Sequence, residues 1–250
     1  MDDLISQWDI AAENIDEDPM RLIRYAMAAR YFSNLQRTVN IVDIGCGEGG
    51  GLRFLQALGF RNLFGVEVSN ERLVRTRERS KDLNIFHVSP DNSILPFSDN
   101  FSDVVISMGV IEHTKDPEWF VRELKRICKK DGFIVISSDG FAWRLLQIAG
   151  LYKSAQPIDK TMSFRAFRKI FHDLGLKIFH FDTFEWEKRG NVILHSIFKW
   201  RIEYTSDFQK ELIKAMEIAR SKPDYSSIYR RKKVMENWFA DENIFLLKKS

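Results

Sequence analysis

Residues 38–52, TVNIVDIGCGEGGGL, decide the fold of this chain. The segment opens with a β-branched apolar run that stops abruptly at a group of glycines, and from Leu52 the apolar residues recur at helical spacing until Gly59. This pattern predicts a buried strand, a tight glycine loop and a helix. The glycines at 45, 47 and 49 or 50 allow positive φ angles and leave room for a ligand against bare backbone, in front of the helix N-terminus. The stretch therefore predicts a cradle for a nucleotide cofactor.

Two classes of cofactor use such a loop, and charge separates them. Gly45, Gly47 and Gly50 satisfy the dinucleotide spacing GxGxxG, with Glu67 about twenty residues further on, where a ribose carboxylate is expected. A dinucleotide would place its dianionic pyrophosphate near Asp43 and Glu48, which would repel it where water is partly excluded. S-adenosylmethionine instead brings an ammonium and a sulfonium to this place. The charges of the loop therefore favour S-adenosylmethionine.

The segment VDIGCGEG resembles motif I of the class I S-adenosylmethionine-dependent methyltransferases. This resemblance implies an α/β fold, a Rossmann-like three-layer α/β/α sandwich around a seven-stranded sheet with strand 7 antiparallel. It also implies that the loop holds the cofactor through Asp43, Gly45, Cys46, Gly47 and Gly49.

Two further cofactor contacts are predicted along the chain. Residues 63–68, LFGVEV, predict a second buried strand, and the Glu67 carboxylate at its end can accept both ribose hydroxyls, with Val68 beside it. After a third strand at 84–88, Asp91 stands four residues before Leu95, which is the spacing of the D-x-x-x-L-P-F element of methyltransferase-type-11-like sequences. The resemblance implies that Asp91 accepts the adenine amino group and that Asn92 donates to a ring nitrogen.

The fourth predicted strand, residues 103–107, leads into the segment MGVIEHTKDPEWF. Ser107, Met108 and Gly109 are expected to line the cofactor, with Met108 as its floor. Thr114 or Asp116 can cap the next helix, which has Pro117 at its first position. Asn70 and Ser163 can cap the helices that follow them, and Asp131-Gly132 is expected to turn into a fifth strand at 133–137. The succession FSDVVIS, IEHTKDP and LKRICKKDGFIVIS resembles the motif region of the same family, with its elements in the same order.

His113 is the candidate catalytic residue. A methyl group on a sulfonium is already activated, so the enzyme must mainly place the acceptor in line with it. If the acceptor is a hydroxyl, a histidine can serve as the base that removes its proton. The alternative is that His113 only fixes the loop after the fourth strand. Glu112 is expected to orient that loop or a neighbouring helix. The quinone O-methyltransferases and the small-RNA 3′-end methyltransferases, which this loop resembles, place a glutamate three residues before the acid as a metal ligand. Gly109 stands there in this sequence, so no metal is expected.

The organisation along the chain is predicted in four parts. Residues 1–36 are a helical leader, residues 37–185 the cofactor-binding core, residues 186–241 a helical insertion over the substrate cleft, and residues 242–250 the last strand. The leader segment DPMRLIRYA resembles that of the quinone O-methyltransferases, which implies that Arg21 contacts the cofactor carboxylate. The alternative is that Arg21, Arg24 and Arg30 form a solvated helix face. The seventh strand is expected at 243–248 rather than at 192–200.

Bulk composition excludes several other classes. A formal net charge of +3 does not by itself indicate a protein that binds polyanions. Two cysteines in 250 residues do not predict a disulfide framework. No apolar run is long enough to span a membrane, so a cytoplasmic protein is expected. The basic run Arg230–Lys233 leaves a peripheral membrane contact open as an alternative to a solvated face. The oligomeric state is not predicted.

The sequence thus predicts a methyltransferase that uses S-adenosyl-L-methionine to modify a small metabolite or a lipid- or sugar-linked precursor, at oxygen or nitrogen. One alternative is a methyltransferase of RNA or protein, which a positive stripe around the cleft would favour. Another is a non-catalytic S-adenosylmethionine-binding module. A dehydrogenase is the most distant alternative.

Overall fold

The structure is a computed structural model that describes most of the core and selected parts of the remaining chain. The described residues are 7, 9, 21–90, 94–140, 145, 147–150, 157–184, 208–221 and 242–249. Their elements are α2 (Arg21–Ala29), β1 (Asn40–Ile44), α3 (Gly50–Ala57), β2 (Asn62–Glu67), α4 (Asn70–Arg79), β3 (Asn84–His87), β4 (Ser102–Met108), η1 (Ile111–His113), α5 (Pro117–Ile127), β5 (Cys128–Asp139), α7 (Phe164–Asp173), β6 (Leu176–Phe184), α9 (Phe208–Arg220) and β7 (Glu242–Lys249).

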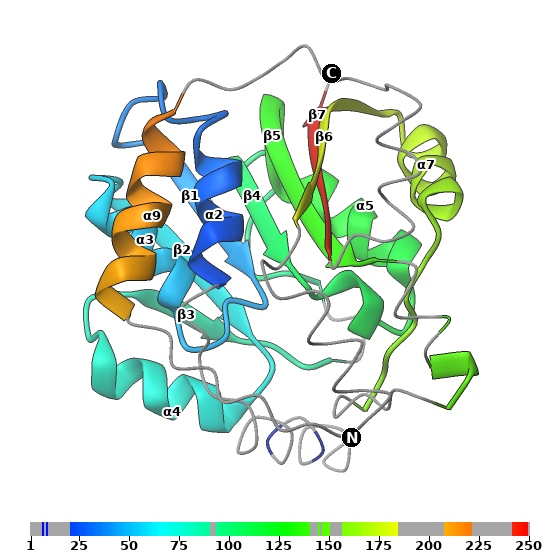
Figure 1. The fold of residues 1–250 in the computed structure, drawn as a ribbon, viewed down its shortest axis with the longest axis horizontal. Coiled ribbons are helices and arrows are strands. Elements are labelled where there is room, and N and C mark those ends of the chain that lie inside the picture. Colours follow the sequence, from blue (N-terminus) through cyan, green and yellow to red (C-terminus); the bar gives the residue numbers. More distant parts are fainter. Residues whose placement is uncertain are drawn as a thin grey trace.

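A single seven-stranded sheet runs through the centre of the molecule in the order β3-β2-β1-β4-β5-β7-β6 (Figure 1). The first five strands are parallel to their neighbours, and β7 is antiparallel to both β5 and β6. The chain reverses its winding direction between β1 and β4, which are adjacent. Open α/β sheets bind ligands beside the carboxyl ends of the strands at such a switch point. The predicted fold is confirmed, including the antiparallel seventh strand.

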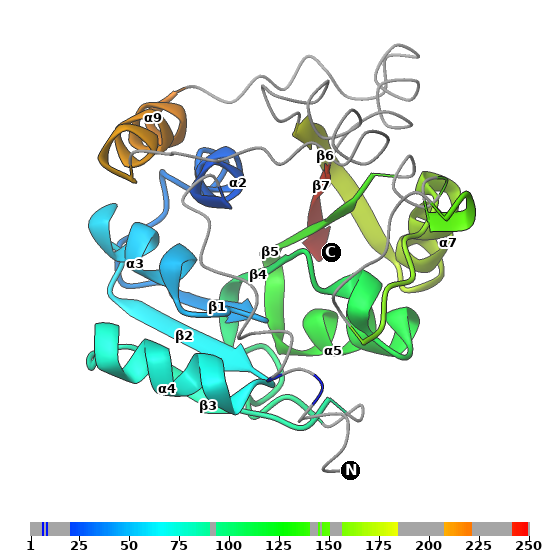
Figure 2. The same cartoon turned by 60° about the horizontal axis from the view of Figure 1, so that its bottom comes forward.

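Each face of the sheet is covered by its own apolar cluster, which gives three layers. On one face, α2 and α3 pack over side chains of β1 and β4 such as Ile41, Val104 and Ile106, and α9 lies against α2 (Figures 1 and 2). On the other face, α5 and α7 cover residues that include Val105, Ile134 and Phe245. The central strands β1 and β4 are buried on both faces at all but one residue each, as their Val and Ile residues predict.

Element boundaries agree with the sequence except at two places. Asn70 is the first residue of α4 rather than its cap, because the Ser69 side chain accepts the hydrogen bond from the Arg72 amide. The predicted turn at Asp131 does not separate α5 from β5, since β5 already begins at Cys128 and carries an irregularity opposite Ser102 and Val104. Asp116 caps α5 and Ser163 caps α7, as predicted.

The leader helix α2 is an integral layer of the core, and Arg24 and Arg30 do not lie on a solvated face. Arg24 is buried, and the side chain of Arg30 forms an ion pair with Asp182 of β6 at 2.6 Å. Residues 22–26, 28 and 29 of α2 are all buried, so the helix is enclosed on most of its circumference, with α3, α9 and the sheet around it. Within the predicted insertion, α9 packs against this helix. The segments 192–200 and 225–240 and the basic run 230–233 lie outside the described residues.

Candidate active site

The glycine loop between β1 and α3 makes three left-handed backbone turns within five residues. Gly45, Gly47 and Gly49 have φ angles of 74°, 57° and 77°. A side chain at 45 would lie 2.3 Å from Val110, so the loop after β4 packs directly on bare backbone there. A Cβ atom at Gly47 would meet nothing closer than 4.0 Å, so its backbone faces open space. The loop therefore offers the bare surface that a cofactor needs.

Glu67, at the end of β2, is held against this loop by three backbone amides. Its Oε2 accepts the Gly47 amide at 2.8 Å, and its Oε1 accepts the amides of Val68 at 2.9 Å and Ser69 at 3.0 Å. The carboxylate is buried, and because Oε1 already accepts two amides, Oε2 is the oxygen that can accept a further hydrogen bond. Glu67 thus fixes the shape of the loop and presents an acceptor at the end of its strand.

Asp43 lies at the bottom of the site and pairs with a residue of the leader helix. The Tyr25 hydroxyl donates to its Oδ2 at 2.9 Å, whereas its Oδ1 is buried without a hydrogen-bond partner in the described part of the chain. Burial raises the pKa of Asp43 to about 7, against the opposing effects of the Tyr25 hydrogen bond and the Arg24 charge. A buried carboxylate oxygen that lacks a donor is suited to a cationic or hydrogen-bonding ligand.

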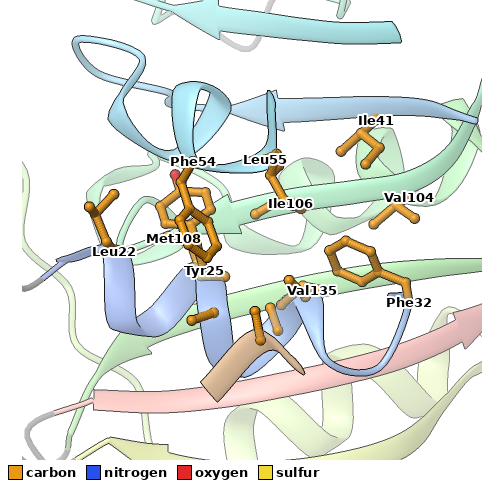
Figure 3. Close-up of a cluster of buried hydrophobic side chains, with 14 of the residues drawn as sticks. Leu22, Tyr25, Phe32, Ile41, Phe54, Leu55, Val104, Ile106, Met108 and Val135 are labelled. Carbon is orange, nitrogen blue, oxygen red and sulfur yellow. The ribbon is translucent and has the colours of Figure 1, made fainter. Parts of the chain in front are cut away.

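Tyr25 also packs on the first turn of α3. A Cβ atom at Gly51 would come within 2.2 Å of the Tyr25 ring, so only glycine fits at that position. Figure 3 shows Tyr25 in the apolar cluster with Leu22, Phe54 and Met108. The pKa of Tyr25 is raised well above its ordinary value, first by burial and then by Asp43, so the hydroxyl keeps its proton.

Glu48 belongs to the glycine loop, but its side chain points toward α4 and away from the cofactor side of the loop. This differs from the expectation that its charge would help to select the ligand. It is buried against α4, where it forms ion pairs with Arg75 at 3.1 Å and with Arg79. Two guanidinium groups neutralise it. The negative charges of the cradle are therefore Asp43 and Glu67.

The end of β4 contributes the other wall of the site. Met108 is buried in the cluster that contains Tyr25, while Ser107 points to the opposite face of the sheet, where its hydroxyl has no partner within the described residues. Gly109 has a φ of 66°, and its amide is anchored by the Ser137 carbonyl at 3.2 Å and the Ser137 hydroxyl at 3.0 Å. The side chain of Cys46, within the glycine loop, is buried in the core. Burial raises the pKa of its thiol, which stays protonated.

Glu112 and His113 follow in the short helix η1. The Glu112 carboxylate is buried and accepts the Asp139 amide at 3.3 Å, which ties the loop to the end of β5 as expected. Nδ1 of His113 lies 2.6 Å from the Ile158 carbonyl. Because a carbonyl only accepts, Nδ1 carries a proton and the neutral ring holds its lone pair on Nε2. This tautomer can serve as a base.

Some of the predicted site residues cannot be placed. Asp91 and Asn92 lie outside the described residues, and Arg21 is placed only by its backbone in α2. Sequence reasoning missed Tyr25, Arg24 and Gly51. The signal for Tyr25 was Gly51, the third consecutive glycine, because a GxGxxG loop does not require a glycine there.

Neither a metal cluster nor a membrane span is present in the part of the chain that has been described. No group of three or more His, Cys, Asp or Glu side chains within the described ranges could hold a metal ion. None of the described helices has the length and apolar character needed to cross a bilayer.

Comparison with known proteins gives a match over the centre of the chain. A family profile described as "Methyltransferase domain" matches residues 42–136, which include the glycine loop, Glu67 and η1. The chain carries a class I S-adenosylmethionine-dependent methyltransferase domain. The resemblance noted from the sequence is thereby confirmed, and S-adenosyl-L-methionine is the cofactor of this family.

Individual relatives of the methyltransferase domain share only part of their length with this chain. The 2-methyl-6-phytyl-1,4-hydroquinone methyltransferase of Synechocystis is 33% identical over 99 residues, which are 39% of this chain and 31% of that protein. The chloroplastic tocopherol O-methyltransferase of Arabidopsis thaliana is 32% identical over 100 residues, 38% of this chain and 29% of that protein. The matched segment thus spans less than a third of either relative.

A solved structure matches over nearly the whole of this chain. It is a chain of the complex between the Haloferax volcanii Trm112 methyltransferase activator and a methyltransferase, with a TM-score of 0.63 and 20% sequence identity, and the match covers 99% of this chain and 96% of that one. This likeness independently shows the fold.

Proposed function

We propose that this protein transfers the methyl group of S-adenosylmethionine to oxygen or nitrogen of a small molecule, a class that includes lipid- or sugar-linked precursors. The observation that carries the proposal is the pair of buried carboxylates, Asp43 and Glu67, at the carboxyl ends of β1 and β2 with an open glycine backbone between them. Two acidic groups 24 positions apart in sequence converge on one loop, and the ionised Asp43 would repel the dianionic pyrophosphate of a dinucleotide.

The residues present fit the cofactor. Asp43 Oδ1, which has no hydrogen-bond partner among the described residues, would receive the α-ammonium group, and Glu67 Oε2 would receive a ribose hydroxyl. The Gly47 backbone would lie beneath the cofactor, with Met108 forming an apolar wall. When bound, S-adenosylmethionine supplies a methyl group on a positively charged sulfur, which needs no further activation by the protein.

The chain's own residues then have three tasks. The glycine loop and β4 position the cofactor, the apolar cluster under α2 excludes water from that end, and His113 takes a proton from the acceptor. The hydrogen bond from Nδ1 to the Ile158 carbonyl holds the ring and leaves Nε2 as the basic atom. A base of this kind suits a hydroxyl acceptor or an ammonium that must lose its proton.

The named relatives support a small-molecule acceptor. Two of them are named as methyltransferases of a phytyl hydroquinone and of tocopherol, which are small and lipophilic, and a third relative, from Cereibacter sphaeroides, is a phosphatidylethanolamine N-methyltransferase. Because those relatives align over limited segments, we take from them the class of acceptor and no individual compound.

Calorimetric titration with S-adenosylmethionine, S-adenosylhomocysteine and NAD tests the cofactor. We expect binding of the first two and none of NAD. A panel of quinols, catechols and aminoalcohol lipids is then assayed for release of S-adenosylhomocysteine. Binding of NAD, or binding of no ligand, would refute the proposal, and cofactor binding without turnover on any acceptor class would support the non-catalytic module instead.

A further inference from the structure

The leader segment contacts the cofactor cradle at two separate points. Tyr25 of α2 donates to Asp43 at the end of β1, as described above. The second point is Asp9, whose Oδ1 accepts the Ser69 hydroxyl at 2.7 Å and the Glu71 amide at 3.2 Å. Tyr25 thus contacts one of the two carboxylates that flank the glycine loop, and Asp9 contacts the turn that follows the other.

The Asp9 contact leads directly to Glu67. The Ser69 amide donates to Glu67 Oε1 at 3.0 Å, and the Ser69 hydroxyl both donates to Asp9 and caps α4 by accepting from the Arg72 amide at 3.2 Å. Ser69 is 1% exposed, so its hydrogen bonds are shielded from water. Asp9 adds a negative charge at the N-terminus of α4, where charge and helix dipole attract each other. The turn that aims Glu67 is thus held from outside by a residue about sixty positions earlier in the chain.

The Tyr25 contact acts on Asp43 in a comparable way. Its hydroxyl occupies one carboxylate oxygen and stabilises the ionised form, while the other oxygen lacks a partner among the described residues. Its ring lies against Gly51 in the first turn of α3. Tyr25 therefore positions both the carboxylate and the start of the helix that supports the loop.

We infer that the leader is part of the cofactor site, with Asp9 and Tyr25 as positioning residues that couple docking of the leader to binding of S-adenosylmethionine. This inference rests on the proposed function. Because the leader holds the same groups that the cofactor needs, binding at the cradle and docking of the leader must favour each other by an equal factor. Neither Asp9 nor Tyr25 needs to touch the methyl group.

The test combines cofactor affinity with amide hydrogen exchange in the full chain. The first variant, Asp9→Ala, removes the acceptor for Ser69, and Asp9→Asn restores an acceptor of the same shape. The second, Tyr25→Phe, removes only the hydroxyl and leaves the ring on Gly51. Two matched controls are Asp173→Ala, which breaks an exposed ion pair with Lys169, and Tyr31→Phe, whose hydroxyl accepts from Arg30 instead of contacting the cradle.

In the unaltered protein we expect S-adenosylhomocysteine to slow amide exchange in the peptides that contain Asp9 and Tyr25. Asp9→Ala and Tyr25→Phe should each weaken S-adenosylhomocysteine binding by about tenfold, as expected for loss of one hydrogen bond to a charged group. Asp9→Asn should recover most of the affinity, and both controls should stay within about twofold.

The outcomes separate this inference from the proposed function. If the unaltered protein binds no cofactor, the proposed function fails first. If it binds, but Asp9→Ala and Tyr25→Phe bind equally well, or the leader peptides exchange at the same rate with and without ligand, the coupling is refuted while the function stands. Should Asp9→Ala fail to fold, the comparison of Asp9→Asn and Tyr25→Phe with the unaltered protein decides.

Discussion

The titration of Asp43 makes cofactor affinity depend on pH. In the cofactor-free protein its pKa is raised to about 7, chiefly by burial. Only the ionised carboxylate attracts the ammonium group of the cofactor, so the competent fraction of the protein falls as pH drops through 7. Affinity should therefore rise with pH and level off above the pKa of Asp43.

The magnitude follows from the fraction of ionised Asp43. With the pKa at about 7, roughly nine-tenths of the protein is competent at pH 8 and about a tenth at pH 6. The dissociation constant should increase about tenfold between these two conditions, which corresponds to about 1.4 kcal/mol. At pH 7 binding should release about half a proton, since the cation draws Asp43 into its ionised form.

Isothermal titration with S-adenosylhomocysteine in buffers of different ionisation enthalpy measures both quantities. The control is Asp43→Asn, which should bind weakly and without this pH dependence, so that any titration of the ligand itself is revealed. Tyr25→Phe should move the inflection to higher pH, because the Tyr25 hydrogen bond lowers the pKa of Asp43. The assignment of Asp43 to the ammonium group is refuted if the dissociation constant of the unaltered protein changes with pH no more than that of Asp43→Asn does.

Three other substitutions test separate parts of the site. Glu67→Gln should weaken S-adenosylhomocysteine binding by about 1.5–3 kcal/mol in calorimetry, through loss of charge at the ribose acceptor, and unchanged affinity would remove Glu67 from the site. Gly51→Ala should lower the melting temperature, with an overpacking cost of about 1–3 kcal/mol against the Tyr25 ring; a higher melting temperature, the usual result of this change within a helix, would contradict that contact. His113→Asn can still donate to the Ile158 carbonyl, so turnover should fall about 10²-fold or more while cofactor affinity stays the same. Unchanged turnover would leave the histidine a role only in holding its loop.

Much of the core was predictable from local patterns. Buried parallel strands need continuous β-branched runs, as in β1, β4 and β5, and the change from such a run to glycines marks where each strand ends and a ligand can lie. The carboxylate at the end of β2 was identified for the same reason, because strand ends converge at one edge of the sheet. Helix starts at Pro117 and Ser163 followed from capping chemistry that acts within four residues.

Predictions that depended on the direction of a side chain were less successful. Glu48 was assigned to the cofactor surface because of its place in the loop, yet it points to α4, where Arg75 and Arg79 neutralise it. Arg24 was counted on a possible solvated face, and burial of α2 against the sheet places it near Asp43 instead. Helical periodicity identifies a buried side but does not identify what lies opposite it.

The sequence by itself determined the fold, the family and the position of the cofactor loop, because each of these depends on residue types at short spacing. Only the tertiary structure decided which distant groups complete the cradle. Tyr25 meets Asp43 across 18 positions, and Asp9 meets Ser69 across 60. Such contacts arise when separate elements pack on the same edge of the sheet, and no periodicity within either segment encodes them. The charge state of Asp43 has the same origin, since its raised pKa is created chiefly by burial beneath the leader helix and the strands around it.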